Sequence, residues 1–243
     1  MSLGRLRAQA AMELRLLLRN GENLLVTLGI PVGLLVFFSV VDVLPVRGRP
    51  VDYLVPGVLT LALMGAGMVS LAIATGFERF YLVLKRLGAT PLRRTELVAA
   101  KIGAVLAVQA VQATVVVAVA WLLGWRPALG PSGVLLAGGA LLLATAAFCG
   151  VGLALAGRLR AVATLALANA LFVVLLLISG IVFPLAALPA ALATLSTLLP
   201  PAALTEVLRA AFAGTASRAD ALVVLTVWGV AAPLIAALVF RWE

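Results

Sequence analysis

Many of the residues that could do chemistry in this sequence lie in one segment between two apolar runs, residues 77–101. Four apolar residues recur there at the i, i+3, i+4, i+7 spacing of one helical face: Phe80, Val83, Leu84 and Leu87. Lys85 and Arg86 lie off this face, and Gly88-Ala89-Thr90-Pro91 ends the helix in an extended turn. A short amphipathic helix that ends in a fixed turn favours docking into a groove on a cytosolic protein. The alternative is a basic loop that only sets the orientation of the chain in a membrane.

The composition argues against catalysis within this chain. It has one Cys, no His and no clustered carboxylates, so we expect neither a metal site nor a hydrolytic centre. No G-x-x-x-x-G-K-[ST] sequence occurs, so we expect no nucleotide-binding loop. The net charge of +9 does not indicate a nucleic-acid partner, because the cations lie between apolar blocks. If the protein moves a substrate uphill, we expect a partner to supply the energy.

The elements that position segment 77–101 are membrane spans. Hydrophobic residues make up 64% of the chain and charged residues 11%, far from the composition of soluble domains. Six stretches are long and apolar enough to cross a bilayer as helices: 24–41, 54–76, 102–123, 132–156, 161–183 and 221–240. They do not alternate in polarity, which argues against transmembrane strands. The sequence therefore predicts an all-α integral membrane protein with six transmembrane helices, and the lack of ionisable residues in them argues against proton coupling.

The cations indicate the orientation of these spans. With a cytoplasmic N-terminus, 13 of the 18 Lys and Arg residues fall in cytoplasmic segments, which predicts that both termini are cytoplasmic. Residues 1–22 are expected to be retained rather than cleaved as a signal peptide. Apolar residues recur there at helical spacing and predict an amphipathic helix in the membrane interface: Leu3, Leu6, Ala10, Leu14, Leu17 and Leu18. The alternative is an extension of the first span, which Asn20-Gly21 would interrupt.

The external segment 184–220 is long but apolar. Prolines at 184, 189, 200 and 201 divide it into pieces too short to span, which predicts short interfacial or re-entrant helices. Glu206 and Arg209 stand i, i+3 there, so we expect a local ion pair. As a hypothesis, this pair pins the external helix and shapes the outward exit.

Several polar residues lie inside the predicted spans: Gln109, Gln112, Thr164, Asn169 and Ser179. Such groups should face another helix or a wet cavity, so they either bind neighbouring helices or line a substrate path. Gly29 and Gly33 form a small-xxx-small pattern in the first span, where a partner helix could pack. Cys149 is expected to be a small packing residue.

Two groups of motifs make the chain similar to a known family. Glu78-Arg79, Val83-Leu84-Lys85-Arg86-Leu87 and Thr90-Pro91-Leu92 closely resemble the coupling loop of type-2 ABC transporter permeases, with a departure at Phe80, Tyr81 and Leu82. A second set resembles the family's fifth span, external helices and closing arginine: Ser179-Gly180-Ile181-Val182-Phe183-Pro184, Leu188-Pro189, Leu199-Pro200 and Leu208-Arg209. The resemblance covers essentially the whole chain, 1–243, and is greatest to the drug-export branch.

The resemblance implies a half-transporter in a bacterial cell membrane. Two permease subunits, identical or different, would pair through spans one and five, which would place Gly29, Gly33 and Asn169 at their interface. Each would bind a separate cytosolic ATPase subunit through residues 77–101, and that partner would hold ATP and Mg. A drug-like, lipid or other amphiphilic substrate would be exported. The alternative function is a membrane scaffold or regulatory subunit without transport.

Overall fold

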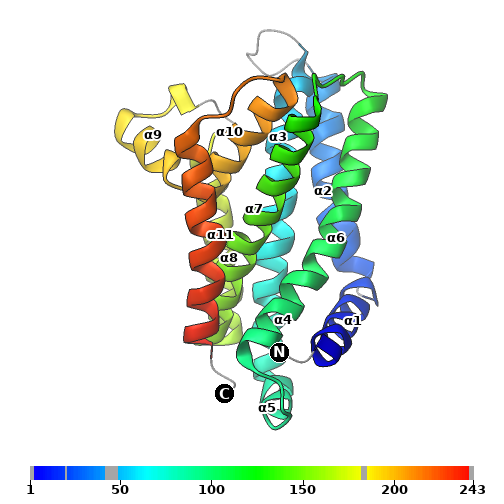
Figure 1. Ribbon diagram of the computed structural model, residues 1–243, viewed down its shortest axis with the longest axis vertical. Coiled ribbons are helices and arrows are strands. Elements are labelled where there is room, and N and C mark those ends of the chain that lie inside the picture. The colour runs from blue at the N-terminus through cyan, green and yellow to red at the C-terminus, as the bar shows by residue number, and fades with distance from the viewer. Residues whose placement is uncertain (1–2, 20, 42–48, 182–184, 241–243) are drawn as a thin grey trace.

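The computed structural model describes residues 3–19, 21–41, 49–181 and 185–240, and within these ranges it contains helices and no strands. The α-helices are α1 (Leu3–Arg19), α2 (Gly21–Val40), α3 (Pro50–Met64), α4 (Leu71–Phe80), α5 (Val83–Gly88), α6 (Arg94–Leu122), α7 (Pro131–Arg158), α8 (Ala161–Ile178), α9 (Ala190–Thr197), α10 (Pro200–Ala213) and α11 (Ala219–Val239). A π-helix, η1 (Gly65–Ser70), joins α3 to α4, and a 3-10 turn, η2 (Leu185–Ala187), precedes α9. The long helices form a bundle with α5 at one end and α9 and α10 at the other (Figure 1).

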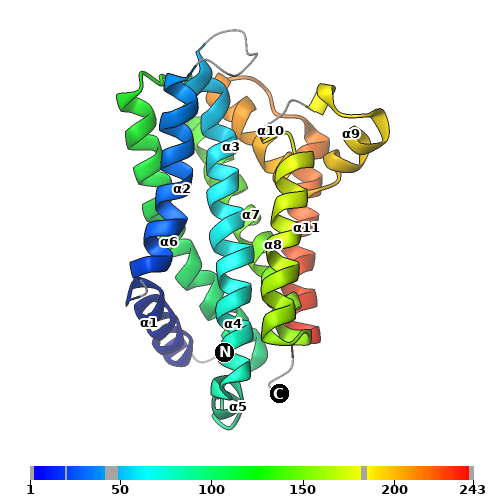
Figure 2. The same cartoon turned by 180° about the vertical axis from the view of Figure 1, so that it is seen from behind.

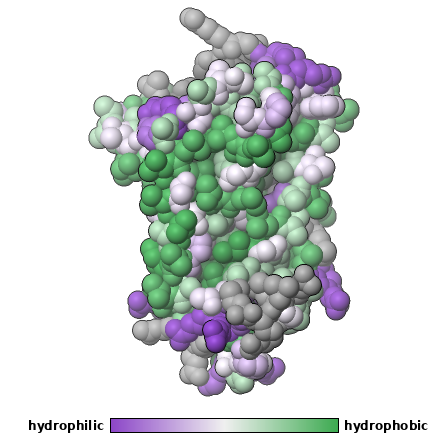
Figure 3. Space-filling model, viewed as in Figure 1, coloured by the Kyte–Doolittle hydropathy of each residue, from purple (hydrophilic) through white to green (hydrophobic). Residues whose placement is uncertain are grey.

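Five helical stretches are long and apolar enough to cross a membrane: Pro50–Phe80, Arg94–Leu122, Pro131–Arg158, Ala161–Ile178 and Ala219–Val239. They correspond to the predicted second to sixth spans, with different ends. Helix α2 covers the predicted first span, and its apolar part, Leu25–Val40, is shorter than the other five. Helices α9 and α10 form a pair bent by 78°, which is either a broken span or a re-entrant loop. The described part of the chain thus has five or six candidate spans, and an apolar belt crosses the middle of the face shown in Figure 3.

Several predicted boundaries were wrong, for local reasons. The second span starts at Pro50, which occupies the first helical turn, and continues through η1 and α4 to Phe80. The predicted fifth span, 161–183, ends as helix at Ile178, because Gly180 adopts a left-handed backbone with φ of 71°. The predicted loop 77–101 is shorter, since α6 begins at Arg94. The backbone N–H of Arg93 donates there to the Glu96 carboxylate at 3.0 Å.

Helix α7 runs through the centre of the bundle, with α11 alongside it (Figure 1). Two of its glycines allow this close packing. A Cβ on Gly150 would lie 2.4 Å from the Ala232 carbonyl carbon of α11, and a Cβ on Gly152 would lie 2.6 Å from the Met68 carbonyl oxygen of η1. Cys149 is buried beside them, in the packing position that was expected.

Helix α1 packs against α6 at the end of the bundle where α5 lies (Figure 2). Its inward face is partly polar, because Gln9 and Glu13 are buried, while Met12 and Leu16 are exposed. The predicted apolar stripe is therefore only half-buried at Ala10, Leu14 and Leu17, and the side chains of its other members lie outside the described residues. The interfacial location of α1 stays a prediction.

Candidate functional site

The connection between α4 and α5 is a tight reversal at the far end of the bundle (Figure 1). Tyr81 N–H donates to the Phe77 carbonyl at 2.9 Å and Leu82 N–H to the Arg79 carbonyl at 3.0 Å. Leu82 then takes a left-handed backbone with φ of 60°, the one non-glycine residue with positive φ in the described part of the chain. Such a conformation costs a leucine about 1–2 kcal/mol. The fold therefore holds a strained residue at this point, as is common at functional sites.

Three consecutive apolar side chains are exposed at this reversal: 66% of Phe80, 65% of Tyr81 and 54% of Leu82. We call Phe80, Tyr81 and Leu82 the α4–α5 tip. The Tyr81 ring packs edge-on to Phe80 at 5.2 Å between ring centroids and stacks on Phe77 at 6.3 Å. Exposed apolar residues beside the exposed cations Lys85 and Arg86 are typical of a protein-binding surface.

The predicted docking face of α5 is divided between the tip and the bundle. Leu84 is fully buried in a cluster with Leu97, Leu153 and Phe240, and Leu87 packs against that cluster. Leu84 therefore lies inside the bundle and not on an exposed face, whereas Leu87 is half-buried and its contact with a partner stays a prediction; both side chains help to anchor α5 to α6, α7 and the end of α11. The exposed apolar residues are instead Phe80, Tyr81 and Leu82, the positions at which the sequence departs from the coupling-loop pattern.

The turn after α5 is held by local hydrogen bonds. The Thr90 hydroxyl donates to the Leu87 carbonyl at 2.6 Å, and Thr90 N–H donates to the same oxygen at 3.0 Å. Pro91 is exposed, whereas Leu92 packs against the buried Leu84 cluster. The Thr-Pro-Leu motif thus fixes the return of the chain from α5 to α6.

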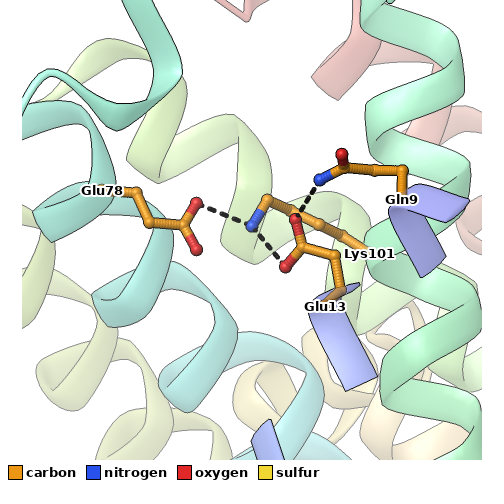
Figure 4. A network of polar contacts seen from close by, with 4 residues as sticks. All are labelled: Gln9, Glu13, Glu78 and Lys101. Carbon is orange, nitrogen blue, oxygen red and sulfur yellow. Dashed lines mark hydrogen bonds and ion pairs between the residues drawn. The ribbon is translucent and has the colours of Figure 1, made fainter. Parts of the chain in front are cut away.

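Above the tip, Lys101 is buried between two carboxylates from different helices (Figure 4). Its Nζ lies 2.7 Å from Glu78 Oε2 of α4 and 2.9 Å from Glu13 Oε2 of α1. Gln9 Nε2 donates to Glu13 Oε1 at 2.8 Å. We call Gln9, Glu13, Glu78 and Lys101 the Lys101 cluster. It joins α1, α4 and α6 at the end of the bundle that carries the tip.

Two residues predicted to contact an ATPase, Glu78 and Arg79, are half-buried and make contacts within the protein. Glu78 belongs to the Lys101 cluster, and Arg79 donates from Nη2 to the Leu159 carbonyl at 2.7 Å, in the connection between α7 and α8. Both brace α4 against its neighbours. Glu13 and Lys101 were not predicted as site residues from the sequence. Two features of the sequence could have pointed to them: Lys101 is a lysine within a helical stretch, and Glu13 is a glutamate on the polar side of a distant helix.

The predicted polar residues of the spans mostly join helices. Gln109 Nε2 donates to the Leu63 carbonyl at 3.1 Å and its Oε1 accepts from the Thr145 hydroxyl, while Gln112 Nε2 donates to the Thr27 carbonyl at 2.8 Å. Thr164 and Ser179 are also buried: Thr164 packs on Gly76, and the Ser179 hydroxyl has no hydrogen-bond partner in the described structure. These contacts favour interhelical roles over substrate contact.

Asn169 differs from the other polar residues because it is exposed. Among the described residues, it donates to the Leu165 carbonyl of its own helix, at 2.8 Å. Asn169 and Lys101 are both among the residues that line a cavity of about 780 Å³, whose other walls come mainly from α1, α2 and α4. Gly29 and Gly33 are exposed on α2, with open space where a side chain would lie. No described residue covers these glycines, and their place in a dimer stays a prediction.

Arg209 has different partners from those predicted. It does not pair with Glu206; its Nη2 donates to the Gly180 carbonyl at 2.9 Å, and its guanidinium lies 4.4 Å from the centre of the Tyr53 ring. Arg209 thus joins α10 to the end of α8 and the start of α3. Pro189 is the residue before α9, and Pro184 lies outside the described residues.

Replacing Arg209 with alanine is expected to lower the free energy of unfolding by about 2 kcal/mol, because a charged hydrogen bond and a ring contact are lost. The measurement is denaturation of the purified chain in mild detergent by titration with dodecyl sulfate. Glu206→Gln is the matched control, and it should change stability by less than about 0.5 kcal/mol. Equal losses in the two variants would mean that the helix depends on charge in general and not on these Arg209 contacts.

The structure is a bundle of apolar helices, and the Lys101 cluster holds the α4–α5 connection at one end. This arrangement is that of a multi-pass membrane protein. Residues 6–213 match the family of ABC-2 type transporters, so the chain belongs to that family and is an ABC transporter permease. No curated protein matches the chain. Within the described residues, no group of His, Cys, Asp or Glu could hold a metal ion.

Proposed function

We propose that this chain is the permease subunit of an ATP-driven exporter and that a separate cytosolic ATPase binds the α4–α5 tip. The observation that carries the proposal is the exposure of Phe80, Tyr81 and Leu82 beyond the apolar belt of the bundle. An exposed apolar patch of this kind indicates a protein partner, and clustered aromatic residues supply much of the binding energy in such interfaces. In this arrangement the tip and both chain termini are cytoplasmic, in a bacterial cell membrane. ATP and Mg are bound by the partner.

The α4–α5 tip is connected to the spans in such a way that a movement of the tip would move them too. Tyr81 and Leu82 follow α4 directly, and α4 continues through η1 into α3 as one helical stretch. Buried Leu84 fixes α5 to the bundle, and the Lys101 cluster ties α4 to α1 and α6. A force on the tip from the ATPase therefore acts on three helices together.

We infer the chemical class of the substrate from the cavity between α1, α2 and α4. Its volume of about 780 Å³ suits a drug-sized or lipid-like molecule, and its walls are largely apolar. Asn169 is among the polar residues that line this cavity. Two copies of the chain, or this chain and a related one, pair through the open Gly29 and Gly33 face and complete the path. We therefore propose an amphiphilic substrate.

The test is the triple variant Phe80→Ser, Tyr81→Ser, Leu82→Gly. Glycine keeps the left-handed turn at position 82 while removing the side chain. The tagged chain is purified in mild detergent with the P-loop ATPase that mass spectrometry identifies beside it. ATPase recovery and ATP-dependent export should both fall at least about tenfold, the loss expected for apolar interface anchors.

The matched control is Leu195→Ser with Leu198→Ser, two exposed leucines at the opposite end of the bundle, at α9 and its C-terminal cap. This variant should keep the ATPase. Leu84→Asp is unsuitable, because Leu84 is buried and the change would disrupt the core. Full ATPase recovery with the triple variant would refute docking at the tip. Absence of any ATPase beside the unaltered chain would favour the scaffold function.

A further inference from the structure

The cavity between α1, α2 and α4 carries an excess of negative charge. Of the described residues that line it, three are charged: Glu13 of α1, Glu78 of α4 and Lys101 of α6. Two carboxylates thus hold one ammonium group between them, and the ionised groups together have a net charge of −1. The other described residues of the lining are uncharged. The cavity therefore favours a positively charged ligand over a negatively charged one.

The most accessible of these three charges is the Glu78 carboxylate. The side chain of Glu78 is 20% exposed, compared with 8% for Glu13 and 1% for Lys101. Glu13 uses both of its oxygens within the Lys101 cluster, one for Lys101 and one for Gln9, whereas only Oε2 of Glu78 contacts another member (Figure 4). The ammonium group of Lys101 is thus covered by its two partners, and a ligand in the cavity meets the carboxylate of Glu78 first.

The other walls of the cavity show what else the ligand must carry. Phe77, which precedes Glu78 in the chain, lines the cavity and is half-buried. An aromatic ring attracts a cation, and more strongly where water is excluded. Leu16 and Leu17 of α1 and Ile73 of α4 add apolar surface. A metal ion would use the carboxylate alone, whereas an organic cation with a large apolar body would contact the carboxylate, the ring and the apolar walls together.

We propose that the cavity between α1, α2 and α4 binds an organic cation with a bulky apolar body, whose charge lies beside Glu78 and Phe77. This narrows the amphiphilic substrate to a cationic one, and as a statement about export it rests on the proposed function. The binding itself depends on α1, α4 and α6 of one chain. It can therefore be measured on the purified chain in the absence of an ATPase.

The test compares two probes that share the same four phenyl groups and carry opposite charges, tetraphenylphosphonium and tetraphenylborate. Each ion is titrated separately into the full chain in mild detergent by isothermal calorimetry, and the heat of partition into protein-free micelles is subtracted. The unaltered chain should bind the phosphonium at least about tenfold more tightly than the borate, because the lining has a net negative charge. Equal affinities for the two ions, or no binding of the phosphonium, would overturn the proposal.

Variants of the two residues beside the charge locate the site. Glu78→Gln should weaken phosphonium binding about tenfold and leave borate binding equal or tighter, because the remaining Lys101–Glu13 pair is neutral. Glu78→Asp, which keeps the charge, should retain most of the preference. Phe77→Leu should weaken phosphonium binding about threefold or more and affect the borate less. If Glu78→Gln does not fold, Glu13→Gln removes the same charge from the same lining and should also reduce the preference.

The matched control is Glu206→Gln, which removes a carboxylate of α10 that does not line this cavity. This variant should bind both ions as the unaltered chain does. An equal loss of phosphonium binding in Glu206→Gln and Glu78→Gln would overturn the proposal, because binding would then reflect the total charge of the protein. Unchanged phosphonium binding in folded Glu78→Gln would also overturn it.

The result is separable from that of the ATPase recovery experiment. If the phosphonium preference is found but no ATPase accompanies the chain, the cation site stands and the proposed export function falls. If an ATPase is recovered and the two ions bind equally, the export function stands and the cationic class of substrate falls.

Discussion

Replacing Lys101 with methionine is expected to lower the free energy of unfolding by about 3–5 kcal/mol, because it leaves buried carboxylates without their counter-ion. Both Glu13 and Glu78 depend on the same ammonium group, at 2.9 and 2.7 Å. Denaturation in mild detergent by added dodecyl sulfate measures the loss. Proteolysis within α1 should become faster as well, since α1 is tied to α6 through Glu13.

Two further variants separate the charge effect from the loss of side-chain packing. The triple variant Glu13→Gln, Glu78→Gln, Lys101→Met should recover most of the stability, because neutral residues of similar volume replace an ion cluster at little cost. Lys85→Met, an exposed lysine at the same end of the bundle, should change stability by less than about 0.5 kcal/mol. A triple variant as unstable as Lys101→Met would show that the loss does not come from unpaired charge.

Replacing Gly150 with valine is expected to destabilise the bundle by about 3 kcal/mol or more. Even the Cβ would lie 2.4 Å from the Ala232 carbonyl carbon and 2.5 Å from the Pro233 nitrogen, which are backbone atoms of α11. Overpacking of this kind costs about 1–3 kcal/mol when side chains can adjust, and here a whole helix must move. Thermal unfolding in detergent and the yield of monodisperse protein measure the effect.

Helix α7 supplies its own control for this variant. Gly138 lies on the same helix, and a Cβ there meets no atom within 4 Å. Gly138→Val should therefore leave stability unchanged or raise it slightly, because valine has a somewhat higher helix propensity than glycine. If Gly138→Val were as damaging as Gly150→Val, the cause would be insertion or backbone propensity and not the contact between α7 and α11.

The spans could be predicted from the sequence because one physical requirement determines them. A helix must be apolar over about 20 residues to cross hydrocarbon, and that requirement acts on local composition. The ends were less predictable: Pro50 starts a helix earlier than the apolar run suggests, and Gly180 ends one earlier. These are effects of single residues on backbone geometry.

The site was only partly predictable, for a different reason. A face formed by Phe80, Val83, Leu84 and Leu87 is apolar whether it meets a partner or the protein's own core, so its periodicity could not assign Leu84 to the interior. The ion pairs of Lys101 reach across 88 residues to Glu13 and 23 to Glu78. For Arg209, the nearest opposite charge in sequence was not its partner in space. Contacts of this kind depend on tertiary packing, which local patterns do not contain.

The π-helix η1 sets the angular phase of everything that follows it in the same helical stretch. A π-turn closes its hydrogen bonds over one residue more than an α-turn, so the residues after Gly65–Ser70 are rotated relative to an uninterrupted α-helix. One residue corresponds to about 100° around a helix with 3.6 residues per turn. The wider turn therefore lets α3 present Leu63 to Gln109 while α4 presents Glu78 to Lys101. The π-turn thus rotates the side chains of α4 about the helix axis relative to those of α3. The two halves of this span can therefore face different neighbouring helices.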